Sequence, residues 1–475
     1  MAANSLPSNM APTSATVSEE DDSATMGAIY GYLGYINDKT GAVELSFLKS
    51  MTPSNGDRTW TLTLHPGIRF SDGTPFNAAA IAYTIAQQAN PNNGYVNYAQ
   101  ERTWKTHVVN ATTMTITLPT RDAQFPAEMT QDFPYISSPT AWRKEGTGFQ
   151  TRPVGAGPFK LQSWTQNDQL TVVPNPYYSR FAPGQPYLSK VVFTLVNQSG
   201  PNELIATVQS GTDNAAWLEG SSEFSKARAA GFNVEPTVSS GGEYLLFNTA
   251  KAPFNNVLAR EAVSYALSST ELAALWSPGT PPFNNLFSTT SPYYDSKYNF
   301  VSPNAAKATA LFKKLQAQGV KMNFTFVTVS AFSQSADYVQ ATLDKYPGVH
   351  VSLALDNIDS YLQAATSGNF GLYAYGIDFA NPWPALQQVF AANGAQNFGK
   401  WNDPVVQKAL DVLATTQSPA LEKKEYLAIS KEVATQYPFF ASQGAVLAYA
   451  TEKSFQNVKT IEFGATPLLA QIWQK

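Results

Sequence analysis

Residues 60–78 read WTLTLHPGIRFSDGTPFNA, and this stretch says the most about the fold. Its first five residues alternate large apolar side chains with threonine, a period of two that predicts a half-buried β-strand. The Pro-Gly pair at 66–67 and the Asp-Gly pair at 72–73 predict turns on either side of a short returning strand. Asn77 is suited to cap a helix that we expect to run to about Gln88. The order is therefore strand, turn, strand, turn, helix.

Strands and helices alternate along the rest of the chain as well. The run at 191–196 is rich in β-branched residues, which is typical of a buried central strand. Tyr30, Tyr32 and Tyr35 indicate a strand near the beginning. Asp403-Pro404 and residues 418–419 each combine a capping residue with a proline suited to the first helical turn, so two successive helices are expected there. The sequence shows no repeat of 20–50 residues, and the pattern predicts an α/β protein.

Length and charge narrow the class of protein. The chain has 475 residues, with 31 Lys and Arg against 35 Asp and Glu, which gives a net charge of −4. So small a net charge gives only a weak electrostatic field, which disfavours nucleic acid and anionic membranes as partners. A single hydrophobic core stops growing at roughly 250–300 residues, so we expect two lobes or more.

Few kinds of chemistry are open to this chain. It has no cysteine and three histidines that are scattered in sequence, so neither a thiolate nor a histidine-rich metal site is expected. The motifs G-x-S-x-G, H-E-x-x-H, G-x-G-x-x-G and the phosphate-binding loop are absent. A glycosidase needs only two nearby carboxylates, which sequence spacing does not reveal, so a secreted hydrolase stays open as an alternative.

The segment F-x-D-G-T-P-F at 70–76, with the strand before it, resembles the signature of the family 5 extracellular solute-binding proteins, the oligopeptide-, dipeptide- and nickel-type receptors of ABC importers. The acidic pair usual at the following helix start is replaced here by Ala79-Ala80. Five further fragments resemble the family in the same order along the chain, and the resemblance covers roughly 27–465. These fragments are Val154–Phe159, Asn175–Tyr178, Ser210–Asp213, the stretch from Phe247 to Phe254, and Arg260–Ala262.

The resemblance implies a definite architecture. It is the two-lobed periplasmic-binding-protein-like type II fold of cluster C, with an extra subdomain of lobe I at about 47–170. Lobe I is expected over 27–246, lobe II over 247–445, and a return to lobe I over 446–475. Residues 1–26 are rich in Ser, Thr, Asn, Pro and Ala, and we expect them to form a flexible leader. Binding of a ligand is expected to close the lobes by a hinge motion.

The resemblance also implies a ligand site. Asp378 matches the first aspartate of the D-x-x-D-P segment that binds the α-ammonium group of peptides in this family, although the second aspartate is Asn381 here. A buried cation needs a fixed opposite charge, so a carboxylate suits this role. Two backbone segments are expected to pair with an extended peptide: Ala374, Tyr375 and Gly376 form one, and Gly31, Tyr32 and Leu33 form the other. Tyr32 replaces the glycine that is usual in the family. Three tryptophans are further candidates for ligand contact, with core packing as the alternative: Trp217, Trp383 and Trp401.

The function implied is that of a receptor and not of an enzyme, with no cofactor. It captures an oligopeptide or dipeptide and delivers it to an ABC-type permease. An oligosaccharide receptor of the same fold is the main alternative, and a nickel-chelate receptor or a hydrolase is less favoured. We expect a monomer outside the cytoplasm whose chain begins after a removed export segment, which in a lipoprotein ends at a lipid-bearing cysteine.

Overall fold

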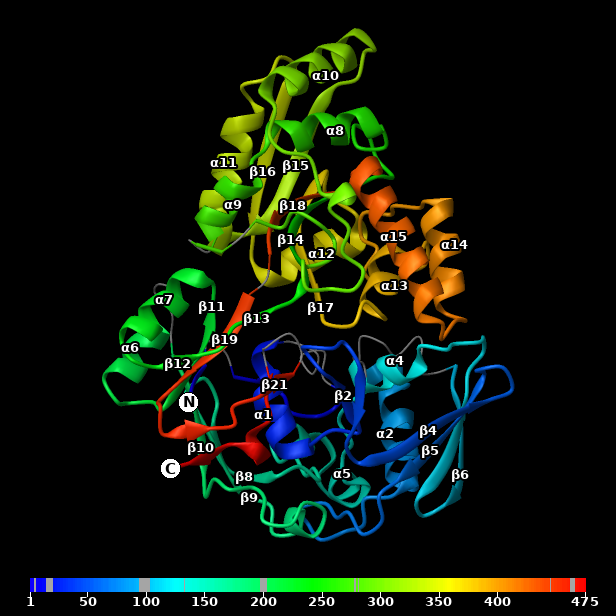
Figure 1. The fold of residues 1–475 in the computed structure, drawn as a ribbon, viewed down its shortest axis with the longest axis vertical. Helices are drawn as coiled ribbons and strands as arrows, with labels where there is room; N and C mark the ends of the chain where they lie inside the picture. The colour runs from blue at the N-terminus through cyan, green and yellow to red at the C-terminus, as the bar shows by residue number, and fades with distance from the viewer. Residues whose placement is uncertain are drawn as a thin grey trace. The chain divides into compact units, whose positions relative to one another are not determined.

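The computed structural model describes most of the chain, and these residues form two compact units (Figure 1). Lobe I comprises Met1–Glu219, Glu223–Thr237 and Leu447–Lys475, and lobe II comprises Gly220–Ser222 and Val238–Val446. The described residues are 1–3, 6–13, 20–93, 103–131, 133–196, 203–276, 279–280, 282–444, 446–461 and 466–475.

The first crossing between the lobes comes earlier than the sequence indicated. The chain leaves lobe I after Thr237, whereas the expected boundary at 246 falls within strand β14, Ser240–Phe247. This strand pairs along its length with β17, Leu372–Phe379, so it belongs to the sheet of lobe II. A boundary inside a hydrogen-bonded strand would split one sheet between two lobes. The second crossing, after Val446, lies close to the expected position.

A mixed sheet of eight strands forms the body of lobe I, in the order β12-β19-β11-β1-β10-β9-β8 with β13 also paired to β19. Its strands are β1 Ala2–Ala3, β8 Phe159–Thr165, β9 Gln169–Pro174, β10 Val191–Leu195, β11 Ala215–Glu219, β12 Asn233–Val234, β13 Thr237–Val238 and β19 Val446–Thr451. Val191 and Phe193 of β10 are buried, as the sequence predicted for a central strand.

The N-terminal residues are part of this sheet, and the prediction of a flexible leader over 1–26 is wrong for those that the structure describes. Ala2 and Ala3 pair in parallel with Thr194 and Leu195. Met10 is fully buried in the core beneath the sheet. Small apolar residues bury well even in a polar segment, because a strand already in place supplies the hydrogen-bond partners that their backbone lacks. The remainder of the leader, residues 4–5 and 14–19, lies outside the described residues.

The strand expected around the first tyrosines is shorter than predicted, because Tyr30 ends a helix and only Tyr35 lies in a strand. Helix α1 spans Glu20–Tyr30, and the strand β2 begins only at Gly34 and ends at Ile36. Tyr30 is fully buried, and its hydroxyl donates a hydrogen bond to the carbonyl of Met10. Tertiary packing therefore overrides the β-propensity of the tyrosines at this position.

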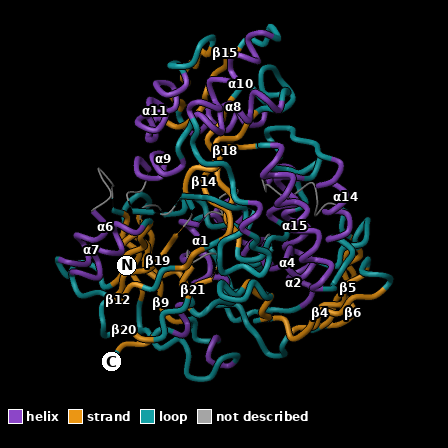
Figure 2. The backbone as a smooth tube through the Cα atoms, turned by 45° about the horizontal axis from the view of Figure 1, so that its top comes forward, coloured by secondary structure: helices purple, strands orange, loops and turns teal. Residues whose placement is uncertain are grey.

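A second sheet of lobe I contains the alternating strand at 60–64. It has the order β4-β5-β7-β6 and lies beside helices α2 and α4 (Figure 2). In β5, Trp60, Leu62 and Leu64 are buried while the threonines are half exposed, which confirms the predicted alternation. Asn77 caps α2 by accepting a hydrogen bond from the amide of Ala80 at 3.0 Å. The returning strand is reduced to an isolated bridge between Arg69 and Pro75. The bounds are β4 Leu48–Ser54, β5 Thr59–Leu64, β6 Lys105–Asn110, β7 Thr113–Thr117, α2 Ala78–Gln88 and α4 Phe125–Gln131.

Lobe II is built on a sheet of five strands in the order β16-β15-β17-β14-β18, covered by helices on both faces. Helices α8 to α11 pack on one face and α12 to α15 on the other (Figure 1). The bounds are β15 Met322–Val329, β16 Val349–Asp356, β18 Phe439–Gln443, α8 Val257–Ala266, α9 Ser269–Trp276, α10 Ala305–Ala317, α11 Ser333–Leu343, α12 Ile358–Ser367, α13 Ala385–Phe390, α14 Pro404–Leu413 and α15 Pro419–Gln436. Caps formed by Asn304 and Asp403 begin α10 and α14, and the cap at Asp403 was expected from the sequence.

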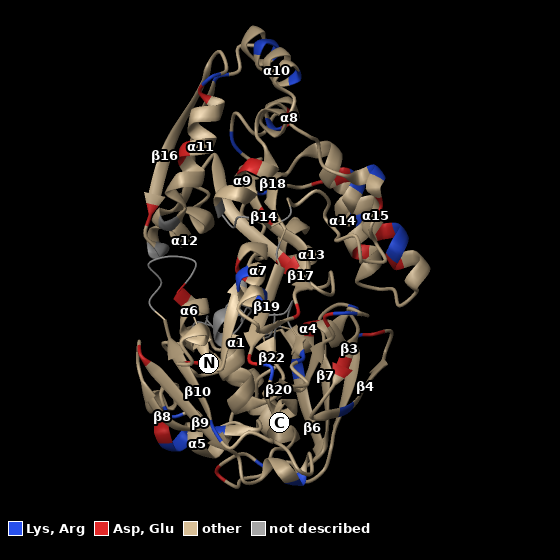
Figure 3. Ribbon diagram, turned by 60° about the vertical axis from the view of Figure 1, so that its left-hand side comes forward, with Lys and Arg blue, Asp and Glu red and all other residues tan. Residues whose placement is uncertain are grey.

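The remaining elements are short. They are β3 Val43–Leu45, β20 Phe455–Gln456, β21 Thr460–Ile461, β22 Thr466–Pro467, β23 Trp473–Gln474, α5 Pro139–Glu145, α6 Glu203–Gln209 and α7 Ser221–Ala229. Charged residues are 14% of the chain and are spread thinly over both lobes, with the clearest groups on α10 and α15 (Figure 3). In the described part of the chain, no helix is long and apolar enough to cross a membrane.

Candidate ligand-binding site

Strand β17 carries four of the predicted site residues, and its alternation decides which face each side chain occupies. Tyr373 and Ile377 lie in the core beneath α12–α15, whereas Leu372 and Ala374 lie in the core beneath α8–α11. Since side chains alternate along a strand, Gly376 and Asp378 continue the face of Ala374, and Tyr375 lies on the opposite face. The four residues are therefore adjacent in sequence, but they are divided between the two sides of the sheet.

One edge of β17 is open where the family resemblance expects a peptide to pair. Strand β14 pairs with all of β17 on one side. On the other side, the register with β15 covers only Leu372 and Tyr373. The carbonyl of Ala374 accepts a hydrogen bond from the hydroxyl of Tyr361, and no described strand pairs with the following two residues on this side. An extended ligand backbone has a place to add beside these two residues, whereas the carbonyl of Ala374 is already used within the lobe.

A second acidic residue, which the sequence analysis did not single out, lies beside this edge strand. Glu243 of β14 is the direct partner of Gly376 in the antiparallel register. A Cβ atom on Gly376 would lie 2.5 Å from Oε1 of Glu243, so the glycine leaves the space that this carboxylate occupies. The hydroxyl of Ser239 donates to Oδ1 of Asp378 at 3.3 Å. Glu243 and Asp378 thus share one face at the same end of the sheet. Two glycines followed by a single acid at the start of an apolar strand were the available sequence signal.

Gln443 of β18 extends this group of hydrogen-bond acceptors. Its backbone is paired with that of Glu243, at a β-bulge that interrupts the register between β14 and β18. The side chain is 3% exposed, and its oxygen Oε1 has no hydrogen-bond partner among the described residues. A buried acceptor of this kind normally has a donor. We call Glu243, Asp378 and Gln443 the acceptor cluster.

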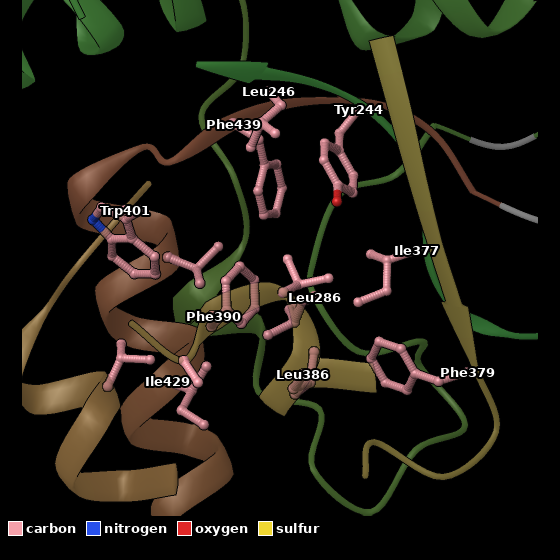
Figure 4. Packing of buried hydrophobic residues seen from close by; sticks show 14 of the residues in the cluster. Tyr244, Leu246, Leu286, Ile377, Phe379, Leu386, Phe390, Trp401, Ile429 and Phe439 are labelled. Carbon is pink, nitrogen blue, oxygen red and sulfur yellow. The ribbon is translucent and has the colours of Figure 1, made fainter. Parts of the chain in front are cut away.

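The opposite face of the same strands is aromatic. Tyr244 and Tyr375 meet edge to face with 5.9 Å between ring centroids, and the rings of Tyr361 and Tyr373 stack at 4.4 Å. The hydroxyl of Tyr244 ends among apolar side chains (Figure 4) and has no hydrogen-bond partner among the described residues. Burial is the main reason that the pKa of Tyr244 is raised well above its usual value, with a smaller contribution from nearby Tyr375 and Glu243. This layer is therefore neutral at physiological pH.

Two of the predicted tryptophans are core residues. Trp383 is 3% and Trp401 is 6% exposed, and both belong to the cluster beneath α12–α15; the ring of Trp401 is labelled in Figure 4. Their rings are covered by the lobe's own side chains, so stacking on a ligand, which the sequence analysis proposed, has no exposed ring face there. Trp217 of β11 is also buried, at 8% exposed. Tryptophan supplies a large apolar area, and lobe II uses Trp383 and Trp401 for packing. Trp217 differs, because its Nε1 atom is buried and has no hydrogen-bond partner among the described residues.

The predicted ligand strand of lobe I is not a strand. Gly31, Tyr32 and Leu33 connect α1 to β2. The carbonyl of Tyr32 accepts from the amide of Phe47, and that of Leu33 accepts from the amides at 46 and 48. Leu33 is fully buried. These two carbonyls are therefore already used within the lobe, and pairing of this segment with an extended peptide stays a prediction.

Gly31 and Tyr32 instead line a cavity of about 340 Å³ that lies within lobe I. Its walls are rich in aromatic rings, and none of its described lining residues is Lys, Arg, Asp or Glu. His65 is one of the wall residues, and its ring packs against Phe181 with 5.8 Å between centroids. The C-terminal segment at 467–471 forms another wall. The cavity suits an uncharged ring that offers hydrogen-bonding groups.

Within the described ranges, no group of three or more His, Asp or Glu residues is placed to hold a metal ion.

Comparison with known proteins fixes the family. The model for bacterial extracellular solute-binding proteins, family 5 middle region, matches residues 42–397. The chain belongs to this family. The matched region includes the motif at 70–76 and the strands β14 and β17. The resemblance inferred from the sequence is therefore confirmed.

Relatives and solved structures agree with the family assignment. The chain is 27% identical over 344 residues to the glutathione-binding protein GsiB of Pectobacterium atrosepticum, an alignment that covers 70% of this chain and 64% of that relative. The chain therefore matches less than two thirds of that relative's length.

Two solved structures are similar over the whole chain. The oligopeptide-binding protein AppA of Bacillus subtilis, in complex with a nonapeptide, gives a TM-score of 0.83 at 17% identity, with 100% of this chain and 98% of that chain covered. DppA of Helicobacter pylori, in complex with the peptide STSA, gives 0.84 at 19% identity, with 100% and 97% covered. At these identities the likeness shows the fold, which is the two-lobed periplasmic-binding-protein fold expected from the sequence.

Proposed function

We propose that this family 5 solute-binding protein is an extracellular receptor that captures a peptide-type solute and delivers it to an ABC-type membrane importer. The names of its relatives support a peptide-type ligand: one binds glutathione, and two related structures hold peptides. The protein acts by binding and release without chemical turnover, as a monomer held outside the cytoplasm, with or without a lipid anchor.

The observation that carries this proposal is that strand β17 has both an open edge and a carboxylate, that of Asp378. Among the residues that the structure describes, no strand pairs with the second half of β17 on the side of β15. Asp378 lies two residues beyond Gly376 on the same strand. Backbone pairing along the edge holds a peptide whatever its side chains, and the carboxylate fixes its amino terminus by a charge-assisted hydrogen bond.

The lobe I cavity supports an oligosaccharide as the second candidate. Its aromatic, uncharged lining suits a sugar ring better than a charged peptide terminus. Native mass spectrometry of the purified protein separates the two, because a retained ligand resolves into either amino-acid or hexose masses. No observation on the described residues favours a nickel chelate or a hydrolase.

Substitution of Asp378 by Asn tests the peptide proposal directly. We expect the variant to bind an unmodified tripeptide about tenfold more weakly or worse, since a charged hydrogen bond contributes about 1.5–3 kcal/mol. Isothermal titration calorimetry with trialanine measures the change. Asp411→Asn is the matched control, because Asp411 lies on the exposed surface of α14 and should leave the affinity unchanged.

An N-acetylated trialanine completes a double-mutant cycle with Asp378→Asn. If the carboxylate binds the α-ammonium group, acetylation weakens binding to the native protein but has little further effect on the variant. Equal losses in both proteins, or an unchanged affinity of the variant for trialanine, remove Asp378 from the site.

A further inference from the structure

The cavity in lobe I is walled by aromatic rings that the lobe leaves partly exposed. Phe181 packs against three of the others. Its ring centroid lies 5.2 Å from that of Phe47, 5.8 Å from that of Tyr178 and 5.8 Å from that of His65. Phe181 and Tyr178 are only half-buried, and both line the cavity. Part of their apolar surface is therefore available to a ligand.

Two glycines near the end of helix α1 leave room for these rings. A Cβ atom on Gly31 would lie 2.5 Å from Cζ of Phe47, and one on Gly27 would overlap the hydroxyl of Tyr32. Both glycines line the cavity. Because neither position has a side chain, the rings keep their places in the wall and the space between them stays open.

Hydrogen-bonding groups that the lobe itself does not use lie in the same wall. Gln185 and Gln471 line the cavity, and their side-chain amides make no hydrogen bond to any described residue. The hydroxyl of Ser46 likewise has no hydrogen-bond partner in the described part of the chain. An amide offers both donors and an acceptor, and so does a hydroxyl. Such a wall matches ligand groups that donate and accept as well, which hydroxyl groups do.

The cavity has no charge to balance a charged ligand. None of its described lining residues is Lys, Arg, Asp or Glu. Burial raises the pKa of Tyr178 to about 12, so its phenol is neutral at physiological pH. A charged group placed there would lose its hydration without gaining an opposite charge. The volume of about 340 Å³ is at the lower end of the range of small-molecule sites, which suits one or two rings.

We propose that this cavity binds an uncharged six-membered ring that carries hydroxyl groups, and that the ring is part of the captured solute. The aromatic side chains contact the apolar surface of the ring, and Gln185, Gln471 and Ser46 bind its hydroxyl groups. The phenol of a tyrosine in a peptide and a hexose of an oligosaccharide share this chemistry. The inference rests on the proposed function, and it names the group of the solute that lobe I recognises.

Calorimetry on the full chain tests the inference with Ala-Tyr-Ala, Ala-Phe-Ala, Ala-Leu-Ala and cellobiose. The native protein is expected to bind Ala-Tyr-Ala or cellobiose about tenfold more tightly than Ala-Leu-Ala, which has no ring. Ala-Phe-Ala has the ring without its hydroxyl group, so it isolates the contribution of hydrogen bonding. Cellobiose distinguishes a sugar from a tyrosine as the source of the ring.

Substitutions in the wall connect this preference to the cavity. Ala182→Trp fills the cavity with a ring of its own and is expected to remove the preference. Ala306→Trp, on the exposed surface of α10, is the matched control and is expected to keep it. Gln185→Leu combined with Gln471→Leu keeps the size of both side chains. It is expected to weaken binding of the hydroxyl-bearing probe about tenfold, while the affinity for Ala-Phe-Ala stays the same.

Circular dichroism melting shows whether each variant is folded. If Ala182→Trp does not fold, the double leucine variant still tests the inference. A folded double leucine variant that binds the hydroxyl-bearing probe as tightly as the native protein does would overturn it.

The outcomes separate this inference from the proposed function. A preference for Ala-Tyr-Ala that Ala182→Trp removes supports both. If the peptides bind without preference for a ring and cellobiose does not bind, the inference is overturned and the peptide function stands. A folded Ala182→Trp that binds every probe as the native protein does also overturns the inference. If cellobiose alone binds and Ala182→Trp abolishes this binding, the cavity is supported and the peptide function fails. If none of the four probes binds, both are overturned.

Discussion

Arg260 connects two segments of lobe II. It belongs to one of the fragments that resemble the family, Arg260–Ala262. It is 5% exposed and comes from α8. Its guanidinium group donates to the carbonyls of Gln436 and Tyr437 at the end of α15 and to that of Phe254. The last carbonyls of a helix lack partners within the helix, so Arg260 satisfies what α15 leaves open. The motif is explained by structure and not by ligand contact.

Arg260→Ala is expected to lower the free energy of unfolding by about 2–4 kcal/mol, because one buried and two partly buried carbonyls lose their donor. Burial lowers the pKa of Arg260 to about 10. The side chain is therefore protonated in both the folded and the unfolded state from pH 5 to pH 8, and the loss should be equal at both ends of that range. Urea unfolding followed by circular dichroism measures it. Lys313→Ala, on exposed α10, is the control, and a loss similar to the control's would contradict the assignment.

The elements of lobe II begin where short capping patterns place them. The carboxylate of Asp403 accepts from the amides of Val405 and Val406 at 2.8 and 3.1 Å, and Pro404 occupies the first turn of α14. An N-cap interaction of this kind needs only local sequence, since all its atoms lie within four residues. The same locality explains why α2 was also predicted correctly.

Asp403→Ala is expected to destabilise lobe II by about 1 kcal/mol, while Asp403→Asn should cost less because the amide oxygen still caps the helix. Differential scanning calorimetry gives the stability, and hydrogen exchange of the first amides of α14 locates the effect. Asp411→Ala, later on the same helix, tests for a simple loss of charge. If it destabilises the protein as much as Asp403→Ala does, the cap is not the cause.

At the scale of the whole molecule, each lobe has its own hydrophobic cores, and solute binding is measurable as stabilisation of the folded chain. Lobe I and lobe II contain two large buried clusters each, and those of lobe II lie on opposite faces of one sheet. A ligand that binds only the folded state raises its stability by mass action, to an extent that depends on its concentration relative to Kd.

A solute present at about 100 times its Kd should raise the free energy of unfolding by about 2.7 kcal/mol. The same concentration should stabilise Asp378→Asn by only about 1.4 kcal/mol if the substitution weakens binding tenfold. Thermal melting of both proteins with a panel of peptides and oligosaccharides measures this difference. A peptide that shifts both melting curves equally would show that Asp378 takes no part in binding it.

The sequence by itself determined the class of fold, the alternating strand β5, the capped helices and the family. These features depend on periodicity and on contacts within a few residues, and such local patterns can be recognised in the sequence alone. The motif around Asp378 also made this residue a candidate from the sequence, and its ligand role stays a prediction. Only the tertiary structure decided that Ala2 and Ala3 complete a sheet and that residues 31–33 are not a strand.

Long-range pairing also decided the composition of the candidate site. The register of β14 against β17 puts Glu243 opposite Gly376, and the register of β18 puts Gln443 beside Glu243. A shift of one residue would turn every one of these side chains to the other face of the sheet. Such a register follows from the packing of two complete faces, with Trp383 and Trp401 buried on one of them, and no local pattern encodes it.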